Sequence, residues 1–224
     1  MSQTLTLTAD DGHTLSAYAA GEPTADASVV ILQEIFGVNA HIRSVADAYA
    51  REGFFALAPA LFDRVERGAE LDYSPAGLER GRATAGRLQP GLILKDIAAA
   101  VAHGRTSVRS QKVGVVGYCL GGSYAWLSAA SLPIDAAVGY YGSKIASSLE
   151  KAPRAPVILH FGALDNGIPL SDVERIRAAF PAVSVYVYNA GHGFNRDGSA
   201  AYSEEAAGLA KERTLSFLRA NLRA

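Results

Sequence analysis

The stretch Lys112-Val-Gly-Val-Val-Gly117-Tyr118-Cys119-Leu120-Gly121-Gly122 decides the fold. Its first half is an apolar run rich in valine, which predicts a strand covered on both faces of a sheet. Its second half has the pattern Gly-x-Cys-x-Gly, and the residues beyond it are spaced as in a helix. This is the nucleophile-elbow pattern, a sharp strand-to-helix turn, with cysteine in place of the usual serine. Small residues two positions before and after the cysteine let strand and helix pack closely, so the thiol projects above the sheet edge.

The turn suits a reactive thiol. Cys119 is expected over the N-terminus of the helix, where the helix dipole favours the negative charge of a thiolate. The backbone N–H of Leu120 is free to point at an oxyanion formed by attack on a carbonyl group. The alternative is a buried, unreactive cysteine, which is the usual state of a free cysteine. Such a residue needs no glycine at both offsets, so we interpret Cys119 as a nucleophile.

Apolar runs alternate along the chain with segments of helical spacing. The runs lie at 29–32, 54–58, 113–116, 136–140, 157–161 and 183–188, and the helical segments near 41–52, 75–87, 91–104, 122–131, 170–180 and 200–221. This alternation predicts a mostly parallel sheet built from βαβ units. Residues 4–8 and 13–19 alternate around Asp10-Asp11-Gly12, which predicts an antiparallel hairpin. The fold class is therefore α/β, a three-layer sandwich with a mostly parallel sheet and an N-terminal antiparallel hairpin.

Length and composition favour one domain. The chain has 224 residues, of which 49% are hydrophobic and 19% charged, enough apolar mass for one sizeable core. We predict a single domain over 1–224, with the charged, Gly-containing segment 63–90 as a surface excursion. Lys and Arg number 21 against 22 Asp and Glu, so the net charge of −1 gives no electrostatic footprint for nucleic acid or an anionic membrane.

Other observations exclude further classes of site. The single cysteine excludes an intrachain disulfide and a multi-cysteine zinc site. No His-Glu-x-x-His, no close His pair and no Gly-x-Gly-x-x-Gly after the first buried strand is present, so neither a metal nor a cofactor is expected. The sequence shows no signal-peptide pattern and no apolar stretch of membrane-spanning length. We expect a cytoplasmic protein; the sequence does not determine its oligomeric state, and a monomer is the expectation.

A cysteine nucleophile needs a base, and the base needs an acid that orients it. Behind this kind of elbow the chain order is nucleophile, acid, histidine. His192 is the histidine that lies in a loop directly after a predicted strand, between two glycines. Asp165 follows the strand 157–161 and is the candidate acid, whereas its competitor Asp172 lies at a predicted helix start. A solvated loop histidine is the alternative for His192, but Cys119, Asp165 and His192 all follow strands at the edge where α/β sheets place their sites.

Two further residues follow the strand 29–32. Glu34 leaves a buried strand at its carboxyl end, an unusual place for a carboxylate. The N–H of Ile35 is the candidate second oxyanion donor, because the loop after the third strand supplies it in this kind of site. The alternative for Glu34 is a loop glutamate in solvent.

The sequence resembles the dienelactone hydrolase (carboxymethylenebutenolidase) family, whose members have the α/β-hydrolase fold. The resemblance spans essentially the whole chain in order. The matching segments are Asp11-Gly12-His13, Gln33-Glu34-Ile35-Phe36-Gly37-Val38-Asn39, Ala58-Pro59, 112–122, Val138-Gly139-Tyr140-Tyr141-Gly142, Ala190-Gly191-His192-Gly193-Phe194, Glu212-Arg213-Thr214-Leu215 and Phe217-Leu218.

This resemblance implies a hydrolase that opens cyclic enol-lactones in aromatic degradation without metal or organic cofactor. Cys119 attacks the lactone carbonyl, His192 is the base that later activates water, and Asp165 holds His192. The resemblance further implies that Glu34 interacts with Cys119 and, when substrate binds, moves to take the thiol proton.

The resemblance also implies that two arginines bind a carboxylate of the substrate. Arg196, four residues after His192, is one candidate. Arg82 is the other, with Arg80 in reserve, because Glu79-Arg80-Gly81-Arg82 matches a Glu-Arg-x-Arg pattern. A guanidinium is a permanent, bidentate donor and would select anionic substrates, whereas the alternative for each is a solvated surface arginine.

The sequence departs from the family around the pocket. Gly193 stands where the best-known members carry a serine, and 83–88 lacks the aromatic residues that the family places after the first arginine. Substrate identity is therefore open between a dienelactone hydrolase and a broader carboxylesterase or thioesterase. A redox sensor built on Cys119 is a different class, disfavoured because the chain holds no resolving cysteine.

Overall fold

The computed structural model describes residues 2–222, in which the strands form one sheet of eight. The strand order is β1-β2-β4-β3-β5-β6-β7-β8, antiparallel across β1, β2 and β4 and parallel from β4 to β8. The strands are β1 (Ser2–Thr8), β2 (Thr14–Ala20), β3 (Ala27–Leu32), β4 (Phe55–Pro59), β5 (Lys112–Tyr118), β6 (Ala136–Tyr140), β7 (Val157–Gly162) and β8 (Ser184–Tyr188). The predicted fold class is confirmed.

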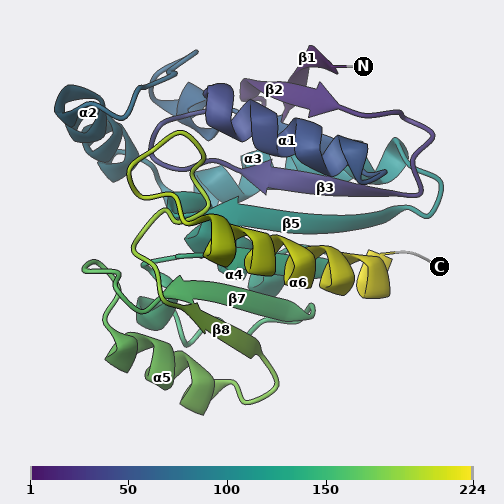
Figure 1. The fold of residues 1–224 in the computed structure, drawn as a ribbon. Helices are drawn as coiled ribbons and strands as arrows, with labels where there is room; N and C mark the ends of the chain where they lie inside the picture. The colour runs from purple at the N-terminus through teal and green to yellow at the C-terminus, as the bar shows by residue number, and fades with distance from the viewer. Residues whose placement is uncertain (1, 223–224) are drawn as a thin grey trace.

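Two layers of helices cover the sheet, and Figure 1 shows α1 and α6 in front of it with α3 and α4 behind. The helices are α1 (Ala40–Arg51), α2 (Pro75–Gly86), α3 (Pro90–Thr106), α4 (Leu120–Ser131), α5 (Leu170–Ala179) and α6 (Glu204–Leu222), with short 3₁₀ turns η1 (Leu61–Arg64) and η2 (Ile145–Ser147). Asn39 caps α1 by accepting a hydrogen bond from the N–H of Ile42, and Ser74 caps α2 in the same way through Gly77. No helix within residues 2–222 has the length and apolar content to cross a bilayer.

The predicted apolar runs form the buried centre of the sheet. Strands β3, β4, β6 and β7 are buried at every position, because helices cover both of their faces. The last strand differs from the prediction. The run at 183–188 reads like the others, but β8 is only half-buried, because it is the edge strand and only β7 pairs with it.

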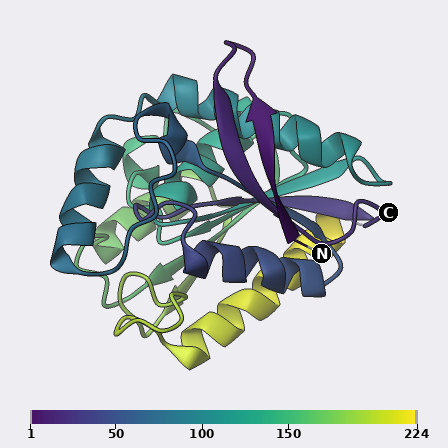
Figure 2. The ribbon, with the colours of Figure 1, turned by 90° about the horizontal axis from the view of Figure 1, so that it is seen from above.

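The predicted hairpin of β1 and β2 is present and projects from the sheet in Figure 2. Gly12 supplies the positive φ of 83° at its turn. Arg64 of η1 fastens this turn to the body of the protein: it donates hydrogen bonds to both carboxylate oxygens of Asp11 and, at 2.7 and 2.8 Å, to both oxygens of Asp96 on α3. The Asp96 side chain is fully buried.

Candidate active site

The nucleophile elbow forms where β5 ends and α4 begins. Cys119 is the N-cap of α4 and has φ 54° and ψ −111°, a left-handed backbone that is unfavourable for a residue with a side chain. Its N–H donates to the carbonyl of Tyr140 at 2.9 Å, which ties the turn to the neighbouring strand β6. The strained backbone is thus held in place by the sheet, as expected for a residue that must present its side chain above the sheet edge.

The two glycines of the motif permit this close packing. A Cβ atom on Gly117 would lie 1.9 Å from the carbonyl oxygen of Gly121, and one on Gly121 would lie 2.2 Å from that of Leu32. Any larger residue at either position would push α4 away from β3 and β5. The spacing read from the sequence therefore has a steric cause.

His192 and Asp165 meet beside the elbow. The Nδ1 atom of His192 lies 2.7 Å from Oδ2 of Asp165, and the other oxygen, Oδ1, accepts the N–H of Gly167 at 2.8 Å. The Asp165 side chain is fully buried, whereas that of His192 is 32% exposed. Both carboxylate oxygens are therefore engaged, and the acid holds the ring in one orientation while the ring still reaches the surface.

The pKa of His192 links it to Cys119. Burial of the ring opposes protonation, but side-chain hydrogen bonds to Asp165 and to Cys119 outweigh it and raise the pKa of His192 to about 10. The structure thus brings together the three residues that the sequence proposes as a triad. At neutral pH the imidazole carries a proton beside the thiol.

Glu34 is paired with Arg196. The guanidinium donates from Nε to Oε2 at 2.8 Å and from Nη2 to Oε1 at 2.9 Å, a bidentate ion pair. The Glu34 side chain is 1% exposed and that of Arg196 13%. Burial lowers the pKa of Arg196, but the pairing with Glu34 outweighs it and raises that pKa above its ordinary value. Glu34 and Arg196, which were predicted to have different roles, are therefore paired with each other.

Gln33 positions Glu34 at the end of β3. Its side-chain Oε1 accepts the N–H of Leu61 at 3.0 Å, and its backbone carbonyl accepts the N–H of Gly121 at 3.0 Å. The loop after β3 is thereby joined both to η1 and to the elbow. This arrangement directs the carboxylate of Glu34 into the site.

The predicted oxyanion donors are unpaired. Within residues 2–222, neither the N–H of Ile35 nor that of Leu120 donates to an acceptor. The carbonyl of Ile35 packs against α2 at Gly81, where a Cβ atom would lie 2.2 Å from it. Helix α2 therefore closes over the loop that carries one of the two donors.

Sequence reasoning missed Tyr141, which directly follows β6. It has φ 40° and is fully buried, and its ring lies 5.0 Å from that of His192 and 5.3 Å from that of Phe194. Its hydroxyl has no hydrogen-bond partner among the described residues. Burial, reinforced by the charge of Glu34, raises the pKa of Tyr141 well above its usual value. Its position directly after a strand could have indicated a site residue, because Asp165 and His192 also lie just after strand ends.

An aromatic corner around Arg196 was also missed. The Phe36 and Tyr73 rings are perpendicular, at 88°, with centroids 4.8 Å apart. The Cζ atom of Arg196 lies 5.1 Å from the first centroid and 4.9 Å from the second, within the range of cation–π attraction. Tyr73 lies in the segment 63–90, which has no regular pattern up to residue 74, so the sequence carried no signal for this contact.

The remaining candidates lie outside this cluster. Arg82 is exposed on α2 and, among the described residues, has no ion pair. Arg80 forms an ion pair with Glu66. Asp172 lies in the first turn of α5 and accepts a hydrogen bond from Arg175, so it is not the partner of His192.

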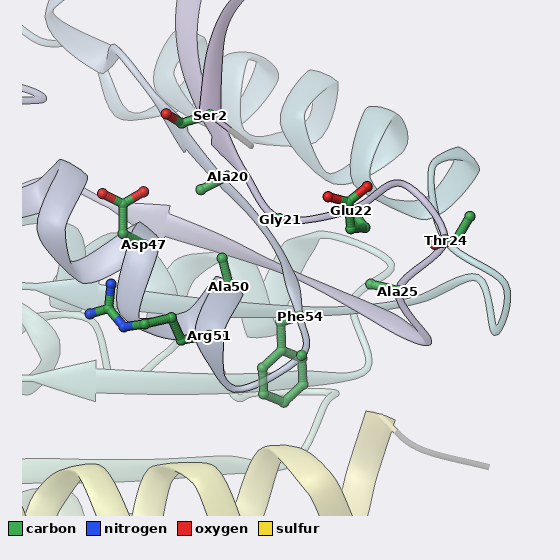
Figure 3. Close-up of a pocket in the computed structure, with 11 residues that line it drawn as sticks. Ser2, Ala20, Gly21, Glu22, Thr24, Ala25, Asp47, Ala50, Arg51 and Phe54 are labelled. Atoms are coloured by element: carbon green, nitrogen blue, oxygen red, sulfur yellow. The ribbon is translucent and has the colours of Figure 1, made fainter.

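Within residues 2–222, no group of three or more His, Cys, Asp or Glu side chains is arranged to hold a metal ion. A cavity of about 570 Å³ lies where β2 and α1 end, between Gly21, Asp47, Arg51 and Phe54 (Figure 3). Because α1 begins beside the loop that carries Glu34 and ends at the opposite edge of the sheet, this cavity is remote from Cys119.

The chain is similar in sequence and in fold to proteins of one family. The model of the dienelactone hydrolase family matches residues 15–222. Carboxymethylenebutenolidases from Pseudomonas putida and Pseudomonas knackmussii are each 39% identical over 220 residues, covering 93% of this chain and 92% of theirs. A solved structure of a Klebsiella pneumoniae protein proposed to be a dienelactone hydrolase superposes with a TM-score of 0.81 at 29% identity, covering 96% of this chain and 98% of that one.

Proposed function

The chain belongs to the dienelactone hydrolase family and is a carboxylic ester hydrolase, and from that premise we propose that it opens enol-lactones of the dienelactone type through a Cys119–His192–Asp165 triad. The hydrogen bond between His192 and Asp165 at the nucleophile elbow is the observation that carries the proposal. The family acts on small-molecule esters or lactones, and the dienelactone is the substrate that the relatives' name suggests for this chain.

Acylation begins with the thiolate of Cys119. Its sulfur attacks the lactone carbonyl and forms a tetrahedral oxyanion, to which the N–H groups of Ile35 and Leu120 donate. Collapse breaks the ring C–O bond and leaves a thioester on Cys119. The enolate that departs takes the proton of His192, which the raised pKa keeps on the ring at neutral pH.

Deacylation reverses the role of the ring. Neutral His192 now removes a proton from water, and the hydroxide attacks the thioester carbonyl. The second tetrahedral oxyanion occupies the same two N–H donors. Its collapse releases the product carboxylate and the Cys119 thiolate, and His192 is again protonated. Asp165 stabilises the imidazolium whenever it forms and orients the neutral ring between, because its buried carboxylate lies 2.7 Å from Nδ1.

Glu34 is proposed to take the thiol proton that must leave before attack. While both its oxygens accept from Arg196, the carboxylate is not free to accept the proton of Cys119. A substrate carboxylate that binds Arg196 would release Glu34, which then receives the proton from Cys119. Activation of the thiol is thereby linked to binding of an anionic substrate, with Arg82 as the proposed second cation.

The same ion pair favours a second candidate function. Glu34 accepts from Nε and Nη2 of Arg196, so the charge of this guanidinium is already compensated in this state. A neutral ester or thioester needs no cation, so a broader carboxylesterase or thioesterase on the same triad is the alternative.

Turnover of three substrates tests the proposal: a dienelactone, a neutral aryl ester and a thioester. We expect hydrolysis that Cys119→Ala abolishes and the highest kcat/KM for the dienelactone. Preference for the neutral ester would favour the alternative, and turnover that survives Cys119→Ala would contradict the triad.

Iodoacetamide alkylation tests the role of Glu34 separately. The chain holds one cysteine, so every adduct reports on Cys119. We expect the Glu34→Gln variant to be alkylated at a different rate from the wild type. Equal rates would show that Glu34 does not control the proton of the thiol.

A further inference from the structure

Tyr73 lies in the irregular stretch before α2, and its ring contacts the guanidinium of Arg196. Its side chain is one of few large apolar ones exposed at the surface, at 37%. One side of its ring faces the guanidinium of Arg196. The ring of an exposed residue therefore covers a largely buried cation, and from this position it can affect which ligands bind that cation.

The loop that carries Tyr73 is fastened to the loop after β3. Leu71 donates its N–H to the carbonyl of Phe36 at 2.9 Å, and Glu70 pairs with Gly37 in an antiparallel bridge. The Nδ2 group of Asn39 donates to the Leu71 carbonyl at 3.2 Å and to the Tyr73 hydroxyl at 3.3 Å. The ring is therefore held by the same residue that caps α1.

The aromatic corner leaves one edge of the guanidinium for a ligand. Nε and Nη2 donate to Glu34, which leaves Nη1 without a hydrogen-bond partner among the described residues. Phe36 and Tyr73 cover the guanidinium, and the Arg196 side chain is 13% exposed. Since a cation shielded from water attracts an anion more strongly than a solvated one, the corner strengthens Arg196 as an anion site.

We propose that Tyr73 is a specificity-determining residue that favours esters and lactones carrying a carboxylate on the acyl part, by keeping water from the guanidinium of Arg196. The proposal rests on the proposed function, in which Arg196 receives that carboxylate. A neutral substrate draws no benefit from Arg196, so loss of the ring should affect the two substrate classes unequally.

A matched pair of esters measures this preference. The 4-nitrophenyl monoester of adipic acid and 4-nitrophenyl hexanoate have six-carbon acyl chains that differ at the end remote from the ester. For Tyr73→Ala we expect the ratio of kcat/KM for the anionic ester to that for the neutral ester to fall roughly tenfold. The fall should come from a higher KM for the anionic ester and not from a lower kcat. Tyr73→Phe keeps the ring and should retain the ratio within about threefold.

Tyr202→Ala is the matched control, because Tyr202 is similarly exposed, at 40%, and has no contact with Arg196. Its ratio should stay at the wild-type value. An unchanged ratio in folded Tyr73→Ala, or an equal loss in Tyr202→Ala, would overturn the proposal. So would an equal loss in Tyr73→Phe, because the bond to Asn39 and not the ring would then be responsible.

Calorimetric binding of adipate separates this proposal from the proposed function. In the Cys119→Ala background, which cannot turn over, adipate should bind roughly tenfold more weakly when Tyr73→Ala is added. Equal binding with and without the Tyr73 ring would overturn the role of Tyr73 even if turnover is normal. Absence of Cys119-dependent turnover in the wild type would contradict the triad. The adipate measurement would still test Tyr73, because it does not depend on turnover.

Discussion

In the proposed mechanism two protons govern the chemistry at the elbow: the thiol proton of Cys119 and the proton that His192 gives to the leaving group. The buried Asp165 carboxylate lies 2.7 Å from Nδ1 and favours the protonated ring. Glu34 is proposed to accept the thiol proton, but only after its ion pair with Arg196 has broken. A different carboxylate therefore acts on each proton: Glu34 follows β3 and Asp165 follows β7.

The activity is expected to depend on the His192 proton at high pH. Because the pKa of His192 is raised to about 10, kcat/KM should fall as pH rises through that value, when the ring no longer protonates the leaving enolate. In Asp165→Asn the ring loses the carboxylate whose hydrogen bond and negative charge favour the proton, so this limb should move to lower pH. NMR titration of His192 checks the assignment, and an unmoved limb in Asp165→Asn would contradict it.

Neighbouring tyrosines at the end of β6 should respond oppositely to loss of the hydroxyl. The Tyr140 hydroxyl lies 2.7 Å from Oγ1 of Thr214, whereas that of Tyr141 has no partner among the described residues. Tyr140→Phe should lower the free energy of unfolding by about 1 kcal/mol. Tyr141→Phe removes a buried group without a bond and should leave that energy unchanged or raise it by about 1 kcal/mol. Urea denaturation compares the two, and equal losses would show that the Tyr141 hydroxyl is bonded in solution.

At the scale of elements, Arg64 joins three parts of the chain. It links the β1–β2 turn through Asp11, its own turn η1, and helix α3 through Asp96. The Asp96 carboxylate is fully buried, and burial raises its pKa despite the guanidinium beside it. The docking of the hairpin therefore depends on a cation that compensates a buried anion.

Removal of Arg64 should be costly. Arg64→Ala leaves the buried Asp96 unpaired, and we expect the free energy of unfolding to fall by roughly 3–5 kcal/mol. The double variant Arg64→Met with Asp96→Leu removes both charges and should lose much less. Chemical denaturation of both measures the difference. Equal losses would mean that packing, not the uncompensated charge, is responsible.

Elements were predictable where their signal is local. The apolar runs and the Gly-x-Cys-x-Gly spacing placed β5 and α4 correctly, because burial and close packing constrain neighbouring residues directly. The half exposure of β8 was not predictable, because it follows from strand order across the sheet. The pairing of Glu34 with Arg196 was missed for a related reason: the family resemblance assigned Glu34 to Cys119 and Arg196 to the substrate, and 162 positions separate the two residues. Tyr73 lies in a loop without periodicity.

At the scale of the whole molecule, a buried polar network connects the strands to the C-terminal helix. His160 in β7 lies 2.8 Å from the hydroxyl of Tyr188 in β8 and 3.1 Å from Oγ1 of Thr214 in α6. Thr214 in turn contacts Tyr140 in β6. Burial, together with the charge of Arg213, lowers the pKa of His160 to about 3. The native ring is therefore neutral across the physiological range.

Acid should destabilise the protein through this histidine. Its ordinary pKa of 6.5 applies in the unfolded chain, so between about pH 6.5 and 3 the unfolded state binds a proton that the native state does not. The contribution of His160 is fully present above pH 6.5 and is lost by about 1.4 kcal/mol for each pH unit below it. His160→Gln should show a shallower decline between pH 6 and pH 4 in thermal unfolding. An identical slope in the variant and the wild type would contradict the role of His160. Thermal unfolding should also show a single transition if 1–224 is one domain.

The ion pair between Glu34 and Arg196 spans 162 positions of the chain. Contacts of such separation form only after a large loop has closed, and they come late in refolding. After dilution from denaturant, far-ultraviolet circular dichroism should therefore recover before esterase turnover does. Because the chain has one cysteine, no intrachain disulfide can cause that lag, and a reducing agent in the buffer prevents disulfides between chains. The recovery of turnover then reports the time at which the loops at the carboxyl edge of the sheet reach their final arrangement.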